Sequence, residues 1–254
     1  MGKRYRILVG VLLVAVVGGL AWQMSRPREP MYEGKPLSYW LLRPSLDRNL
    51  DAVRQTGTTA IPTLLQMLRA KDSVFFLKVV KLMKKQRFIK IDYVFAGERN
   101  FQAILGFGIL GVKAGEAVPA LVEIYDQAIS SDSMCATADS LGAIGPLARP
   151  AVPSLLRGVT NKDENVRFGS LSALELIGPE SSLLMPVLET SLKDNDWKVR
   201  NQAAHMLGGL GADAKHAVPA ILPLLIDTQR MVRVAATNAL IAIDPEAAAK
   251  AGVQ

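Results

Sequence analysis

Few residues in this chain have side chains suited to catalysis or metal binding. The 254 residues include only two histidines, His205 and His216, and one cysteine, Cys135. General acid–base catalysis most often uses histidine, and zinc sites need several cysteine or histidine ligands. The sequence also lacks a phosphate-binding glycine loop, a nucleophile elbow and a zincin helix. It therefore predicts no catalytic residue, no metal ligand and no cofactor, and we expect a protein that is not an enzyme.

The side chains best suited to binding a ligand form a basic cluster between residues 78 and 90, with Tyr93 close by. On a helix, Lys78, Lys81 and Lys85 share one face, opposite an apolar stripe. This face is suited to anionic lipid headgroups, a phosphorylated or nucleic-acid ligand, or an acidic protein segment. It is equally typical of the solvated side of an amphipathic helix, so both interpretations stay open. The basic cluster comprises Lys78, Lys81, Lys84, Lys85, Arg87 and Lys90.

The positive charge of the chain is concentrated in its first part. Residues 1–110 contain 18 Lys and Arg against 7 Asp and Glu, net +11, whereas residues 111–254 contain 12 against 16, net −4. An anionic lipid surface attracts basic segments, so a membrane explains this distribution as well as DNA does. Nucleic acid is therefore disfavoured as a partner, and it remains the alternative, together with other anionic ligands, for the basic cluster.

The N-terminus carries a membrane-targeting pattern. Ile7 to Met24 is an uncharged run of 18 residues that follows three basic residues. Such a run predicts a single membrane-spanning helix with the rest of the chain on the extracytoplasmic side. A cleaved signal peptide remains the alternative, because Gly19 and Ala21 are small residues at a suitable spacing. We expect residues 1–24 to be the anchor or signal peptide, and residues 25–50 to be an extended stalk followed by a capping helix around Trp40.

Three sets of residues recur along the chain with a period of 33 or 34 positions, which is the signature of a repeat protein. Proline tolerates the first turn of a helix, and glycine suits the turn after a helix ends. Each repeat is therefore predicted to contain a first helix, A, ending at the glycine, and a second helix, B, starting at the proline. In one unit, A covers about 196–210 and B about 215–226. The sets are Pro119, Pro153, Pro186 and Pro219; Gly111, Gly145, Gly178 and Gly211; and Val166-Arg167, Val199-Arg200 and Val232-Arg233.

These landmarks resemble the HEAT repeat family, and most closely its short-repeat bacterial members. The resemblance covers residues 51–254 and implies an all-α fold, a right-handed α–α superhelix. In that family an Asp or Asn six residues before an Arg links adjacent repeats as a ladder, which implies an architectural role for these charges. The pairs in this chain are Asn161 with Arg167, Asp194 with Arg200, and Asp227 with Arg233.

The regular pattern is interrupted at residues 86–97, where a B helix and its proline are missing. The apolar residues alternate there in a strand-like manner. Such an insertion either contributes to a binding face or fills the gap left by the missing helix. Taken together, the sequence predicts a membrane-tethered HEAT-repeat scaffold that binds an unidentified protein partner. A HEAT-like lyase or chaperone for a pigment has no support among the residues beyond the repeats.

Overall fold

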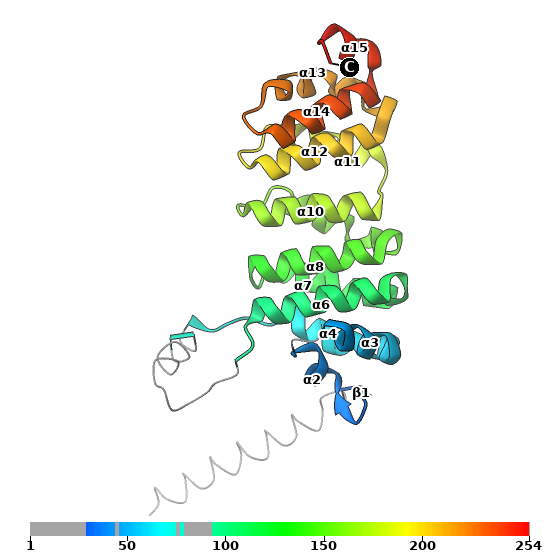
Figure 1. The fold of residues 1–254 in the computed structure, drawn as a ribbon, viewed down its shortest axis with the longest axis vertical. Helices are drawn as coiled ribbons and strands as arrows, with labels where there is room; N and C mark the ends of the chain where they lie inside the picture. Colours follow the sequence, from blue (N-terminus) through cyan, green and yellow to red (C-terminus); the bar gives the residue numbers. More distant parts are fainter. Residues whose placement is uncertain (1–28, 44–45, 75–76, 79–92, 254) are drawn as a thin grey trace, which may run out of the picture.

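The computed structural model describes residues 29–43, 46–74, 77–78 and 93–253. The predicted membrane segment, residues 1–24, and most of the basic cluster lie outside the described residues. The described chain is an elongated stack of helices in two layers (Figure 1). This confirms the prediction of an all-α helical solenoid.

The A helices lie side by side along the stack, with the B helices in a second layer behind them (Figure 1). The A helices are α6 (Ala96–Leu110), α8 (Ser131–Ile144), α10 (Glu164–Ile177), α12 (Trp197–Leu210) and α14 (Arg230–Ile243). The B helices are α7 (Val118–Gln127), α9 (Val152–Gly158), α11 (Ser181–Ser191) and α13 (Val218–Ile221), which continues into the 3-10 helix η5 (Leu222–Ile226). A last short helix, α15 (Pro245–Lys250), packs on α14.

Each of the predicted glycines ends an A helix. Gly111, Gly145, Gly178 and Gly211 have φ angles of 51°, 72°, 64° and 57°. Glycine adopts this left-handed conformation without the steric cost that a Cβ atom imposes. Three of them open a 3-10 helix that leads to the next B helix: η2 (Gly111–Ala117), η3 (Gly145–Ala151) and η4 (Gly211–Ala217).

The prolines start B helices as expected, with one exception. Pro119, Pro153 and Pro219 lie in the first turn of α7, α9 and α13. The last of these helices begins at Val218, later than the predicted residue 215, because η4 comes first. Pro186 lies inside α11, so the prediction that it starts a helix is wrong. No 3-10 helix separates α10 from α11, and α11 therefore begins earlier relative to its proline.

The N-terminal end of the described chain is folded rather than extended. The strands β1 (Met31–Tyr32) and β2 (Lys35–Pro36) pair antiparallel, and α2 (Leu37–Leu41) follows directly. The Nε1 of Trp40 donates a hydrogen bond of 2.8 Å to the carbonyl oxygen of Tyr32, and Trp40 is buried. The stalk prediction is therefore wrong for residues 29–36, because contacts with α2 fold this segment back.

The first helices of the stack follow α2. They are α3 (Leu46–Thr56), the 3-10 helix η1 (Gly57–Ala60) and α4 (Ile61–Leu68). Of the predicted insertion, residues 86–92 lie outside the described chain, residues 93–95 have no regular structure, and residues 96–97 already belong to α6. The helix starts early because the Asp72 carboxylate accepts a hydrogen bond of 3.1 Å from the backbone N–H of Ala96. The predicted end of the insertion is therefore two residues too late.

One helical stretch of the described chain, Ala96–Gln127, is apolar and long enough to cross a membrane by composition. It is not a continuous helix, because the chain turns at Gly111 between α6 and α7. Its large apolar residues Phe107 and Leu121 are fully buried against neighbouring helices. This stretch therefore forms part of the solenoid core.

Candidate functional site

A ladder of charged side chains joins the C-terminal repeats. The guanidinium of Arg167 donates two hydrogen bonds of 2.7 Å, from Nε and Nη2, to the carboxylate of Asp194 in the next repeat. Arg200 binds Asp227 in the same way, at 2.8 and 3.0 Å. Such bidentate pairs fix the relative orientation of the two groups. Each pair therefore connects the start of one A helix to the loop before the next.

Each arginine of the ladder also binds backbone carbonyls in its own repeat. Nη1 of Arg167 donates to the carbonyl of Asn161, Nη1 of Arg200 to that of Asp194, and Nη1 of Arg233 to that of Asp227, at 2.9, 2.7 and 2.7 Å. The residues six positions apart are thus joined through the backbone, and the carboxylates bind the arginine of the preceding repeat. The family resemblance implied that an Arg and the Asp or Asn six residues before it link adjacent repeats. In the structure, the links between repeats instead join each aspartate to the arginine 27 residues before it.

The ladder charges are shielded from solvent and stabilise each other. The Asp227 carboxyl accepts hydrogen bonds from Arg200, and these hold its pKa below the ordinary value of 3.8. Burial is the largest single effect on Asp194 and opposes its ionisation, but the hydrogen bonds from Arg167 and the backbone of Asp196, together with the charges of Arg167 and Arg200, outweigh it and lower that pKa as well. Both aspartates are therefore ionised at neutral pH, and each stabilises the contact between two adjacent repeats.

The ladder stops at Met134, which occupies the place of Arg167 one repeat earlier. Next to it, Arg157 donates a hydrogen bond of 2.9 Å to Asp126, and Ser154 donates one of 3.0 Å to the same carboxylate. This contact joins α7 to α9 in place of a ladder pair. None of these three residues belongs to the repeating sets, so the repeat pattern did not predict the contact.

Only two residues of the predicted ligand-binding set are described. Lys78 is exposed. Tyr93 is half-buried, and its hydroxyl donates a hydrogen bond of 2.6 Å to Asp72, which raises its pKa. Tyr93 also stacks edge-on against Phe95, with ring centroids 5.2 Å apart. Lys81, Lys84, Lys85, Arg87 and Lys90 lie outside the described residues. Asp72, which sequence reasoning missed, thus binds both Tyr93 and the first residue of α6.

The outer surface of the first A helices combines apolar and acidic side chains. We use the name A-helix face for five exposed or half-buried residues: Phe101 on α6, Asp132 and Asp139 on α8, and Phe168 and Glu175 on α10. Asp139 is exposed at this surface, yet the surrounding protein withdraws enough water from its carboxyl group to raise its pKa. Because this face combines an exposed aromatic ring with carboxylates, it is the best candidate for contact with a partner.

The side chains with catalytic potential lie apart from one another. Cys135 is half-buried on α8, where burial, followed by the charge of Asp139, raises the pKa of its thiol to about 12. His205 and His216 are exposed, each 3.3 Å from a glutamate, Glu175 and Glu189 respectively. Within the described residues, no group of three potential metal ligands comes together.

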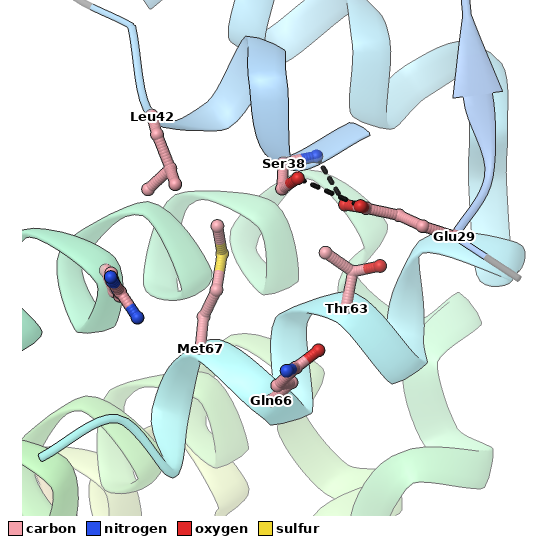
Figure 2. A pocket seen from close by; sticks show the side chains of 7 residues that line it. Glu29, Ser38, Leu42, Thr63, Gln66 and Met67 are labelled. Carbon is pink, nitrogen blue, oxygen red and sulfur yellow. Dashed lines mark hydrogen bonds between the residues drawn. The ribbon is translucent and has the colours of Figure 1, made fainter. Parts of the chain in front are cut away.

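A small pocket lies at the N-terminal end of the stack (Figure 2). It has a volume of about 260 Å³ and is lined by Glu29, Ser38, Leu42, Thr63, Gln66, Met67 and Arg99. The Glu29 carboxylate accepts hydrogen bonds from the backbone N–H and the hydroxyl of Ser38, the latter at 2.9 Å. Glu29 thereby holds the segment before β1 against α2. The pocket marks the junction between the N-terminal cap and the first repeats.

The sequence matches the profile of HEAT repeats over residues 118–208 and 184–251. Together these ranges cover residues 118–251, which is more than half of the chain. The chain belongs to the HEAT repeat family. The HEAT ladder described above lies inside the matched region. No curated protein shows significant sequence similarity to the chain.

The HEAT solenoid also resembles solved structures of engineered repeat proteins. One engineered protein is 19% identical, with 85% of this chain and 96% of that chain covered and a TM-score of 0.48. A second is 16% identical, with 82% and 97% covered and a TM-score of 0.50. Computationally designed armadillo repeat proteins for modular peptide recognition are 16% identical, with 82% and 98% covered and a TM-score of 0.48. At such low identity these similarities concern the fold alone.

The two layers of the HEAT solenoid are packed differently. Consecutive A helices contact each other far more extensively than consecutive B helices do. Glycine permits this closeness: a Cβ atom added at Gly208 would lie 3.0 Å from the Cα of Ala239 on the next A helix. The A layer is therefore the more closely packed of the two layers, and the A-helix face is the exposed surface of that layer.

Proposed function

We propose that this HEAT-repeat protein is an interaction scaffold that binds a basic, partly apolar segment of another protein on its A-helix face. Family membership supports a scaffold, because HEAT repeats present extended surfaces for binding. The observation that carries the proposal is the composition of this face. Phe101 is 51% exposed, and Asp132 and Asp139 are exposed on the adjacent helix.

The chemistry of the face selects the partner. Large exposed apolar side chains contribute binding energy when a partner removes them from water. Carboxylates around them attract lysine and arginine and repel acidic segments, which adds specificity and speeds association. Residues 111–254 have a net charge of −4, so the charge of the whole region favours the same kind of partner.

We further propose that residues 7–24 tether the scaffold to a membrane, with the solenoid on the extracytoplasmic side. The support is the uncharged 18-residue run and the basic residues before it. The tether would hold the A-helix face near the membrane surface, where it meets membrane or envelope proteins.

Photo-crosslinking in intact cells tests the binding surface. The photoreactive residue p-benzoylphenylalanine replaces Phe101 in the full chain, and adducts are identified by mass spectrometry. We expect a discrete adduct with another protein that is lost in the double variant D132K/D139K. The matched control is E116K/D213K, which reverses two exposed charges on η2 and η4, outside the A-helix face. Equal adduct yields in both double variants would contradict the proposed surface.

A further inference from the structure

Within the part of the chain that the structure describes, the arginine at the C-terminal end of the ladder, Arg233, has no carboxylate partner. Nη1 of Arg233 donates to the carbonyls of Asp227 and Thr228, at 2.7 and 3.2 Å, as the corresponding atoms of Arg167 and Arg200 do in their repeats. These bonds orient the guanidinium as in the other two arginines. Its Nε and Nη2, which in Arg167 and Arg200 bind an aspartate, have no acceptor among the described residues.

The side of α14 next to Arg233 is exposed and apolar. Val234 and Ile241 are 45% and 38% exposed, and their spacing of seven positions places them on one face of the helix. The equivalent residues of α12 are Asn201 and Gly208, and both contact α14. Asn201 donates a hydrogen bond of 2.9 Å to the carbonyl of Met231, and Gly208 lies against Ala239. These two positions are therefore where a HEAT repeat receives the next A helix.

We propose that Arg233, Val234 and Ile241, which we call the C-terminal edge, bind a helix of a different protein that begins just after an aspartate. In that contact, as in the ladder, the carboxylate accepts hydrogen bonds from Nε and Nη2 of Arg233. The helix that follows the aspartate packs on Val234 and Ile241. Charge complementarity selects the aspartate, because a cation at a half-buried site is stabilised by a paired carboxylate. The C-terminal edge is a second surface, separate from the A-helix face.

A second copy of the chain is a poor occupant of this edge. A symmetric contact would place the same patch of two copies together. Two Arg233 guanidinium groups would then face each other. α14 has no acidic side chain that could pair with the Arg233 of a second copy, since its sequence is RMVRVAATNALIAI. The repulsion would remain unrelieved, which is why the inference commits to a different protein.

A peptide of this chain provides a defined probe. Residues 193–211 contain α12 and Asp194, which bind α10 and Arg167 inside the solenoid. We expect this labelled peptide to bind the full-length chain and to lose more than about tenfold in affinity when it carries Asp194→Asn. The chain variants V234E and I241E should reduce binding similarly, and because both residues are exposed they should leave the thermal unfolding temperature unchanged. The matched control V112E alters a valine on η2 that is also exposed, at 62%. Binding that none of these changes alters, or no binding at all, would overturn the proposal.

Crosslinking in cells then identifies the natural occupant. With p-benzoylphenylalanine in place of Val234, we expect an adduct with another protein, and its crosslinked peptide should contain an aspartate just before a helix. R233Q should reduce the adduct more than about tenfold. An adduct of twice the chain's mass, or none, would overturn the proposal. The test differs in position from that at Phe101, so failure at one surface leaves the result at the other unaffected.

Discussion

At the scale of single residues, the shared arginines of the ladder are the most consequential feature. The side chains of Arg200 and Asp227 are only 14% and 9% exposed. Removing one partner of a shielded pair leaves the other charge without compensation, which costs more than the pair itself contributes. Stability should therefore depend on each member of the ladder.

Asp227→Asn tests this dependence. We expect it to lower the free energy of unfolding by about 2 kcal/mol at neutral pH. Because the pKa of Asp227 is lower in the folded than in the unfolded chain, its contribution is present above the ordinary value of 3.8 and disappears as the pH falls through the folded pKa. Urea unfolding at several pH values measures this. The difference between wild type and variant should vanish at low pH, whereas Asp213→Asn, on the exposed part of η4, should cost nothing; a difference that persists in acid would contradict the assignment.

The thiol of Cys135 should be nearly inert in the folded protein. A rise of its pKa from 9.0 to about 12 lowers the thiolate fraction at pH 8 by about 1,000-fold. We expect alkylation by iodoacetamide to be slow in the native chain and rapid in urea, as followed by mass spectrometry. Asp139→Asn should accelerate the native reaction modestly, because it removes the nearest negative charge. Equal rates in native and unfolded protein would show that the thiol is not desolvated.

Residue patterns predicted the helices well and their connections less well. Gly111 and Pro119 impose local backbone conformations, so their spacing alone indicates where α6 ends and α7 begins. The ladder is different, since Asp194 lies six residues before Arg200 and 27 after Arg167. Both separations repeat with the same period, and only the three-dimensional stack decides which arginine receives the carboxylate. For the same reason the hairpin at residues 31–36 and the A-helix face depend on long-range packing that composition does not reveal.

At the scale of helices, the close approach of neighbouring A helices is a feature that glycine permits. Two adjacent glycines of α12 make a matched test. Gly208→Ala should lower the free energy of unfolding by about 1–3 kcal/mol, because the new methyl group meets the backbone of Ala239 at 3.0 Å. Gly209→Ala has open space around it and should raise stability by up to about 1 kcal/mol, through helix propensity.

Chemical denaturation of both alanine variants measures the effect. Small-angle X-ray scattering adds a second observable, since a wider spacing between α12 and α14 changes the dimensions of the stack. If Gly208→Ala proves as stable as Gly209→Ala, glycine is not what allows the A helices to approach each other.

At the scale of the whole molecule, the proposed tether can be tested without knowledge of a partner. We expect the full chain to stay in the membrane fraction after alkaline carbonate extraction and to be released when residues 7–24 are deleted. Protease added to the extracytoplasmic side should digest the solenoid. Release of the full chain by carbonate, or protection of the solenoid from that side, would contradict the proposed topology.

The ladder also determines how the molecule responds to mechanical load. Tension applied along the stack acts on each Arg–Asp contact in series, so the weakest junction governs where rupture begins. Among the described residues, the junctions on the N-terminal side of α10 have no Arg–Asp ladder pair, so the array has two segments of unequal resistance. An optical-trap experiment on the full chain would therefore record two successive force plateaus, with the N-terminal segment yielding first and the segment from α10 to α14 extending as one unit.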